Sequence, residues 1–282
     1  MMDITIAIAV MTCVSIFAGL ITANFAYSDK GQWTMLGLAM SVLAMVYFLI
    51  YGSGQLIWAR FIPSSAAIIY TNVAALFAAM AAGWAWRLPK TPAWRRGGLS
   101  VLLGCASLAV ICWPLLSIAL RPPPEGGDVW QNGVAMQTSW ATCSPAAAAT
   151  LLKSENIQAN ESELIPLCLT DSSGTPTLGL YRGIKLVAQR QGRSVSVVSS
   201  SLQQLVAEKD WPVLIAVELP FGVKDRRYAE QWGWIPGMGH SVVLFGRTEE
   251  GGFIIGDPSV GLEKWSEKDM ELLWHGDGIR ID

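Results

Sequence analysis

The stretch QTSWATCSPAAAATLL, residues 137–152, contains the residue best suited to nucleophilic chemistry, Cys143. Ser139 or Thr142 can cap a helix that begins near Cys143. A thiol at the amino terminus of a helix faces the positive end of the helix dipole, which favours the thiolate and lowers the thiol pKa. The stretch therefore predicts a nucleophile. A buried structural thiol and a disulfide with Cys168 are the alternatives.

A thiolate needs a base, and His240 is the better candidate of the two histidines. It begins the stretch HSVVLFG, which is typical of a strand, whereas His275 lies beside the end of a last short helix. The next predicted strand ends at Asp257, so a hairpin of the two strands places this carboxylate beside His240. An imidazole base needs such an acceptor on its second nitrogen. The alternative for Asp257 is a turn residue, and both roles are compatible.

Gln137 precedes Cys143 by six residues and is a candidate for an oxyanion-stabilising amide, together with the backbone N–H of Cys143. The order Gln, Cys, His and Asp is that of papain-type thiol peptidases. No HExxH motif or paired CxxC motif is present in the sequence, so neither a metal nor another cofactor is expected. Four further residues are candidates for contacts with the substrate: Trp140, Trp232, Trp234 and Gly239.

Four segments resemble, in order, the peptidase domains that cut double-glycine leaders from bacteriocin precursors, known as cysteine peptidase family 39. The segments are QTSWATCSPAAAATLL, SGTPTLGLYRGIKLVAQRQG, GHSVVLFG and IIGDP. The resemblance covers most of residues 130–282 and implies a papain-like fold. The roles that it implies are nucleophile for Cys143, general base and acid for His240, orienting acceptor for Asp257 and oxyanion donor for Gln137.

Three features depart from this family's pattern. The family usually has Asp-Cys-Gly at the nucleophile, whereas this chain has Thr142, Cys143 and Ser144. The best-known members are fused to an ABC exporter, but the sequence contains no P-loop of the GxxxxGK type, which excludes export driven by this chain itself. Those domains act on the cytoplasmic side of the membrane, in contrast to the orientation that the basic residues of this chain predict.

The elements that must position these residues are helices followed by strands, which indicates an α+β domain over residues 130–282. Residues 219–238 separate the central strand from His240 and are predicted to be an insertion. The insertion is a substrate lid, a membrane-surface contact or a loop with its own small core. Helices are expected at 143–152, 161–169 and 175–192, and strands of an antiparallel sheet at 194–199, 211–219, 240–246 and 252–258.

The first part of the chain contains four long apolar stretches, each of about the roughly 20 residues that cross a bilayer as a helix. Residues 1–121 are therefore predicted to be an all-α, four-helix transmembrane anchor. The proline-rich and glycine-rich residues 122–129 are predicted to be a linker to the peptidase domain. The four stretches are residues 4–27, 33–51, 64–86 and 97–120.

Basic residues in the short loops predict the orientation in the membrane. Five of these basic residues lie in the first and third loops, and two lie on the other side of the membrane. The side with more basic residues is expected to be cytoplasmic, so residues 122–282 are expected to face the extracytoplasmic side. This second part carries a net charge of −7, against +5 for the first part, which disfavours nucleic acid as a partner. The first group is Lys30, Arg87, Lys90, Arg95 and Arg96, and the second is Arg60 and Arg121.

The leading hypothesis is a membrane-anchored cysteine peptidase that cleaves a peptide or protein near the bilayer surface. One alternative keeps the acyl-enzyme chemistry but passes the acyl group to an amine, as a transferase or transpeptidase does. Another is a non-catalytic receptor or adaptor that binds a peptide. The expected partners are a peptide or protein substrate, the lipid bilayer, and a separate membrane protein or exporter.

Overall fold

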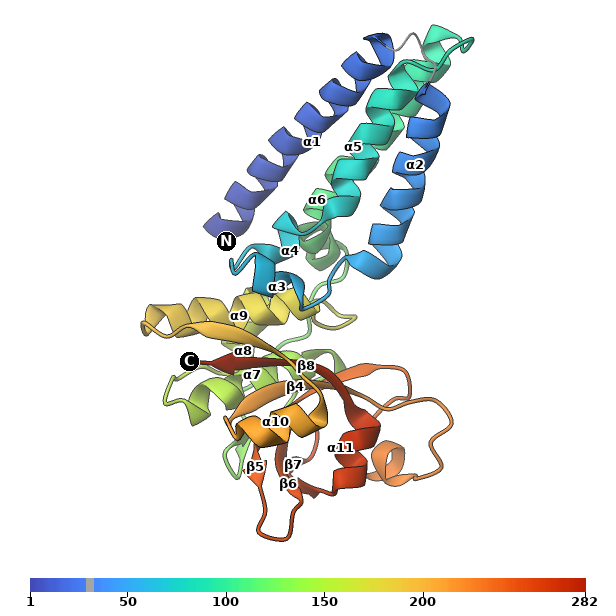
Figure 1. Ribbon diagram of the computed structural model, residues 1–282. Helices are drawn as coiled ribbons and strands as arrows, with labels where there is room; N and C mark the ends of the chain where they lie inside the picture. Colours follow the sequence, from blue (N-terminus) through green and yellow to red (C-terminus); the bar gives the residue numbers. More distant parts are fainter. Residues whose placement is uncertain (29–32) are drawn as a thin grey trace. The chain divides into compact units, whose positions relative to one another are not determined.

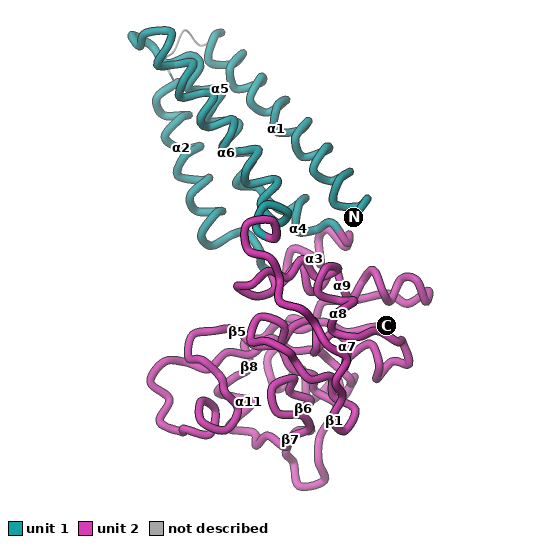
Figure 2. The backbone as a smooth tube through the Cα atoms, turned by 180° about the vertical axis from the view of Figure 1, so that it is seen from behind, with its two compact units in different colours: residues 1–55, 66–117 teal, residues 56–65, 118–282 magenta. Residues whose placement is uncertain are grey.

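The computed structural model describes residues 1–28 and 33–282, which form two compact units (Figures 1 and 2). Unit 1 consists of residues 1–55 and 66–117, and unit 2 of residues 56–65 and 118–282. The predicted linker at 122–129 lies inside unit 2, and the predicted domain boundary remains a prediction. Lys30, counted above among the loop cations, lies outside the described residues.

Unit 1 is built of helices, four of which are long and apolar enough to cross a membrane. Each of the four candidate spans overlaps one of the predicted stretches, which confirms the all-α first part of the predicted fold class. The second span continues α2 as a π-helix, and the third joins the short α4 to α5. The elements are α1 (Met2–Ser28), α2 (Thr34–Tyr47) with the π-helix Phe48–Gly52, α4 (Ala67–Tyr70), α5 (Val73–Trp86) and α6 (Ala93–Leu120).

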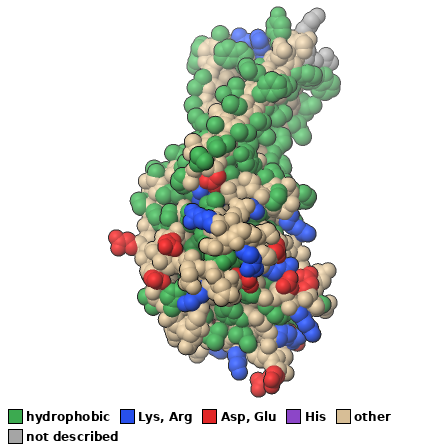
Figure 3. All heavy atoms as spheres, turned by 90° about the vertical axis from the view of Figure 1, so that its left-hand side faces the viewer, with side chains coloured by type: hydrophobic (Ala, Val, Ile, Leu, Met, Phe, Trp, Pro, Cys, Tyr) green, Lys and Arg blue, Asp and Glu red, His purple; other side chains and the backbone are tan. Residues whose placement is uncertain are grey.

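Small residues let the helices of unit 1 approach closely. Helix α5 contacts both α1 and α2 and buries mainly alanine, so backbones can pack directly. A Cβ atom added at Gly83 would lie 2.2 Å from the carbonyl oxygen of Gly19, so only glycine fits there. Helix α6 is tied to α5 by the hydrogen bond from Ser107 Oγ to the Ala75 carbonyl, at 2.8 Å. Apolar side chains cover the outer surface of these helices (Figure 3).

Unit 2 contains a six-stranded, fully antiparallel sheet in the order β3-β8-β4-β5-β6-β7. The four predicted strands correspond to β3, β4, β5 and β6, which confirms the antiparallel sheet of the predicted fold class. Strands β7 and β8 were not among the predicted strands, and His275 lies in β8. The strands are β3 (Val195–Ser199), β4 (Val213–Glu218), β5 (Gly239–Arg247), β6 (Phe253–Asp257), β7 (Gly261–Trp265) and β8 (Trp274–Ile281), beside a separate hairpin of β1 (Trp130–Gln131) and β2 (Val134–Ala135).

Helix α7 lies against the sheet and carries the candidate nucleophile at its start. It contacts β4, β5 and β6 as well as α8 and α9, and ten of its residues are buried. A second core joins α10 and α11 to the sheet through Leu205, Met270 and the aromatic residues of the insertion. The helices are α3 (Trp58–Phe61), α7 (Cys143–Ser154), α8 (Glu161–Leu167), α9 (Thr177–Arg190), α10 (Leu202–Glu208) and α11 (Glu267–Leu273).

Candidate active site

Cys143 is the first residue of α7 and is 8% exposed. A short 3-10 helix, Trp140–Thr142, leads into it and is fixed by a capping box in which Ser139 and Thr142 exchange side-chain and backbone contacts. Cys143 thus lies at the amino-terminal end of α7, where the positive end of the helix dipole favours a negative charge on the thiol. Cys143 and Cys168 are both free thiols, so the disulfide alternative does not hold in this structure.

His240 and Asp257 come from the paired strands β5 and β6, as the predicted hairpin requires. His240 Nε2 lies 2.8 Å from Asp257 Oδ1, and the aspartate side chain is fully buried. Ser259 donates to the same carboxylate oxygen from its backbone N–H at 2.8 Å and from its hydroxyl at 2.7 Å. Burial alone would raise the pKa of Asp257, but His240 and these donors lower it, so the carboxylate stays ionised.

The pKa of Cys143 is set by opposing effects. Burial would raise it, but the charge of His240 and a hydrogen bond with that imidazole lower it, and the net shift is downward. Burial likewise would lower the pKa of His240, whereas the charges of Asp257 and Cys143 raise it well above its usual range. With Nε2 bound to Asp257, Nδ1 is the ring nitrogen left for the thiol. The arrangement favours a thiolate and imidazolium pair.

Two serines beside these residues join α7 to β5. The hydroxyls of Ser144 and Ser241 are 2.8 Å apart, and both side chains are buried. Ser144 Oγ also lies 3.9 Å from the sulfur of Cys143. Both residues help to lower the thiol pKa, Ser144 through its hydroxyl and Ser241 through its backbone N–H. Neither serine was predicted to belong to the site, because the two are 97 residues apart in the chain.

Trp234 contacts both His240 and Asp257. Its indole Nε1 donates to Asp257 Oδ2 at 3.0 Å, and its ring centroid is 4.6 Å from that of His240. Trp232 stacks on Trp265 with centroids 5.4 Å apart and interplanar angle 11°. Trp234 therefore lies at the site, whereas Trp232 lies in the aromatic core beside it.

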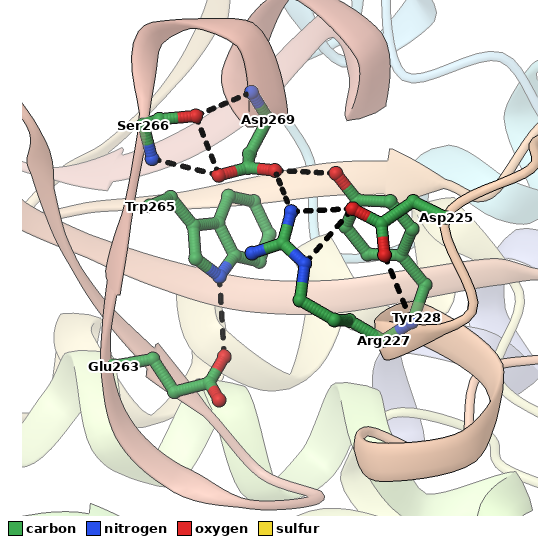
Figure 4. A network of polar contacts seen from close by, with 7 residues as sticks. All are labelled: Asp225, Arg227, Tyr228, Glu263, Trp265, Ser266 and Asp269. Carbon is green, nitrogen blue, oxygen red and sulfur yellow. Dashed lines mark hydrogen bonds and ion pairs between the residues drawn. The ribbon is translucent and has the colours of Figure 1, made fainter.

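A network of polar contacts anchors the insertion that carries Trp234 (Figure 4). Arg227 donates to Asp225 at 2.6 Å and to Asp269 at 3.1 Å, and the hydroxyl of Tyr228 also donates to Asp269. Ser266, at the start of α11, donates to the other oxygen of Asp269 at 2.7 Å. Tyr228 and both tryptophans of residues 219–238 are buried, so the insertion has a small core of its own, and its roles as a substrate lid or a membrane-surface contact stay predictions.

Gln137 lies in an irregular segment, since the expected strand through it ends at Ala135. Its backbone N–H donates to the carbonyl of Pro258 at 2.9 Å, which brings it next to Asp257. Its side-chain Oε1 is buried and has no hydrogen-bond partner among the described residues. Gln137 thus lies on the His240 side of the site, and its buried side-chain oxygen lacks a hydrogen-bond donor among the described residues.

A small cavity of about 40 Å³ lies beside His240. Cys143 is buried and is not one of its lining residues. Of the four residues predicted to contact substrate, Trp140, Trp234 and Gly239 line the cavity and Trp232 does not. The cavity is also lined by Gln137, Ser259 and the exposed apolar residues Ile235 and Met238.

Comparison with known proteins finds a family that covers the second part of the chain. The family described as the Peptidase C39 family matches residues 131–281. No curated protein compared with the chain matches it.

Three solved structures are similar to the chain. The peptidase domain of Streptococcus ComA, a bi-functional ABC transporter involved in quorum sensing, is 22% identical over 52% of this chain and 96% of that one, with a TM-score of 0.41. A double glycine motif protease from an AMS/PCAT transporter, in complex with the leader peptide, is 18% identical over 57% and 96%, with a TM-score of 0.41. The peptidase domain of Streptococcus mutans ComA is 21% identical over 53% and 98%, with a TM-score of 0.36.

Proposed function

The chain belongs to the Peptidase C39 family, a family of cysteine peptidases, and from this premise we propose that it is a membrane-anchored peptidase with Cys143 as its nucleophile. The observation that carries the proposal is the contact of Cys143 with His240, whose Nε2 lies 2.8 Å from the buried carboxylate of Asp257, and this contact lowers the pKa of the thiol. Structural thiols in an apolar interior have the opposite shift, as Cys168 does, whose pKa burial raises to about 12.

In the proposed reaction the thiolate of Cys143 attacks the carbonyl carbon of the scissile peptide bond. Imidazolium His240 donates its Nδ1 proton to the leaving amine, and an acyl-enzyme thioester remains. Neutral His240 then takes a proton from water, whose oxygen attacks the thioester carbonyl and releases the acid and the thiolate. The oxyanion of each tetrahedral intermediate is stabilised by the side-chain amide of Gln137 and the N–H of Cys143.

Asp257 and Trp234 are proposed to hold the imidazole in the orientation that this sequence of proton transfers needs. Asp257 fixes Nε2 and stabilises the positive charge of His240. Trp234 donates to the free carboxylate oxygen and covers the imidazole with its ring, which keeps water from the hydrogen bond between His240 and Asp257. Trp234 is therefore a positioning residue rather than a substrate contact alone.

The substrate is proposed to be a peptide with small residues at the cleavage site. The cavity beside His240 has about 40 Å³ of space, far below the roughly 300–1,000 Å³ of pockets that hold drug-sized ligands, so bulky side chains beside the scissile bond do not fit it. Exposed apolar side chains surround it, among them Trp140, Ile235 and Met238, and these suit apolar residues farther along the peptide.

The test compares the full-length protein with its Cys143→Ala variant on peptides that differ only at the cleavage position, Gly-Gly against Leu-Leu. We expect cleavage of the Gly-Gly peptide by the wild type, none by Cys143→Ala, and full activity of the control Cys105→Ala, whose thiol is on α6 outside the site. The mass of the product separates transfer to an amine from hydrolysis. Binding and cellular phenotype that both survive Cys143→Ala would instead establish the receptor or adaptor.

The peptidase unit is proposed to lie on the extracytoplasmic side, on the strength of the basic residues in the loops of unit 1. Glu250, in the exposed turn between β5 and β6, and Lys90, in the exposed loop before α6, provide labelling positions. A membrane-impermeant maleimide should label Glu250→Cys in intact cells and Lys90→Cys only after permeabilisation. The reverse pattern would place the peptidase unit in the cytoplasm.

A further inference from the structure

A groove of about 690 Å³ runs between α1 and α6 in unit 1 and has α5 as its floor. Its lining is mainly apolar and small, with Gly19 of α1, Ala82 and Gly83 of α5 and Gly104 of α6 among the residues that leave the space open. Ser15 also lines it, is 4% exposed, and its hydroxyl has no hydrogen-bond partner among the described residues. The groove is thus narrow, apolar and supplied with one unsatisfied polar group.

One end of the groove is basic. Arg87 lines both the groove and a second cavity of about 660 Å³, which is also lined by Lys90 and Arg96. Arg87 is held there by a hydrogen bond from its Nε to the Ala23 carbonyl at 3.3 Å. The Nε atom of Arg96 is buried and has no partner among the described residues. Among the described residues, no Asp or Glu lines either cavity.

We propose that this continuous site binds one anionic phospholipid, with an acyl chain in the groove and the phosphate at Arg87, Lys90 and Arg96. An apolar channel that ends at several cations matches the two parts of such a lipid. Arg forms paired hydrogen bonds with phosphate oxygens, which satisfies the buried Nε of Arg96 as well as the charge.

The position of the basic end supports this occupant over a protein helix. Arg87 follows α5, and Arg96 lies in the first turn of α6, so the cations are at the ends of membrane-spanning segments where headgroups lie. The basic residues of the loop before α6 predict that this loop lies on the cytoplasmic side of the membrane. The cytoplasmic leaflet is the one that carries anionic lipids. A transmembrane helix of a partner would need a carboxylate at this depth to match the same charges.

The test measures lipid adducts on the full-length protein by native mass spectrometry, after it is mixed in detergent with equal amounts of phosphatidylglycerol and phosphatidylcholine. We expect the phosphatidylglycerol adduct to predominate in the wild type. Arg87→Gln and Arg96→Gln should each weaken it about fivefold, as the loss of one cation near a headgroup does. The matched control is Arg95→Gln, which removes an exposed cation of the first turn of α6 that lines neither cavity.

A second pair of variants tests the acyl-chain groove without a change of charge. A Cβ atom added at Gly104 or at Gly98 meets nothing within 4 Å, so both positions of α6 are open to a side chain. Gly104→Leu fills the groove and should abolish the adduct, whereas Gly98→Leu, outside it, should not. Each of three results would overturn the proposal. The wild type retains the two lipids equally, or Arg95→Gln loses as much of the adduct as Arg87→Gln and Arg96→Gln do. In the third, the wild type shows no lipid adduct but a dimer that Gly104→Leu dissociates. None of these readouts depends on peptidase activity.

Discussion

A hydrogen bond of 2.8 Å joins the hydroxyls of Ser144 and Ser241, which directly follow Cys143 and His240 in the sequence. It therefore connects α7 to β5 at the place where the sulfur and the imidazole must meet. Peptidases of the family that the sequence resembles usually have glycine at the position of Ser144, so this connection is a feature of the present chain.

Ser144→Ala should destabilise the protein by about 1–3 kcal/mol, because it leaves the buried hydroxyl of Ser241 without its partner. Ser241→Ala should cost a similar amount for the same reason. The double variant should cost less than the sum of the two, since it leaves no unsatisfied hydroxyl. Chemical denaturation measures all three. Strict additivity would show that the two hydroxyls do not interact in the folded protein.

The same two variants should differ in their effect on the thiol. Ser144 lowers the pKa of Cys143 through its hydroxyl, whereas Ser241 acts through a backbone N–H that alanine retains. The pH midpoint of Cys143 alkylation should therefore rise more in Ser144→Ala than in Ser241→Ala. Equal midpoints in the two variants would contradict the assigned contacts.

Trp234→Phe should lower kcat/KM roughly tenfold, since a hydrogen bond to an ionised group contributes about 1.5–3 kcal/mol and part of that loss falls on the transition state. The variant keeps an aromatic ring over His240 but removes the donor to Asp257. Trp232→Phe is the matched control, because Trp232 stacks on Trp265 in the same core without a bond to the site. If Trp234 had a purely structural role, kcat/KM would fall equally in the two variants and its pH midpoint would not shift.

Asp257→Asn should narrow the active pH range from its alkaline side. Burial would lower the pKa of His240, and the charge of Asp257 is the main effect that raises it. Imidazolium is lost as the pH rises through this pKa, so removing the charge moves the alkaline limb of kcat/KM to lower pH. The acid limb follows Cys143 and should move less. The pH profiles of the two proteins on one peptide give the comparison, and an unchanged alkaline limb would refute the assignment.

The parts of the site that the sequence could predict are those with a local signal. The helix at Cys143 follows from Ser139 and the apolar run after it, and the pairing of β5 with β6 follows from two short strands on either side of a glycine turn. Ser259 had such a signal too, because Asp-Pro-Ser is typical of a turn in which the aspartate accepts from the backbone two residues later.

Other features depend on contacts between distant residues, which no periodicity reveals. Trp234 donates to Asp257 from an insertion that Arg227 and Tyr228 anchor to Asp269 in α11. From sequence, Trp232 and Trp234 are equivalent aromatic residues of one loop, yet one contacts the site and the other the core. Strand β8 was missed because Gly276 and Gly278 interrupt its apolar alternation, while its pairing with both β3 and β4 fixes it in the sheet.

The most direct test of the account is the rate of Cys143 alkylation by iodoacetamide as a function of pH, in the wild type and in His240→Ala. The modified residue is identified by peptide mass spectrometry, and buried Cys168 serves as the unreactive internal reference. We expect wild-type Cys143 to react with a midpoint well below the ordinary thiol pKa of about 8.5, and His240→Ala to move that midpoint upward, because burial then acts without the opposing charge. A midpoint at the ordinary value that does not respond to His240→Ala would contradict the proposal that this imidazole activates the thiol.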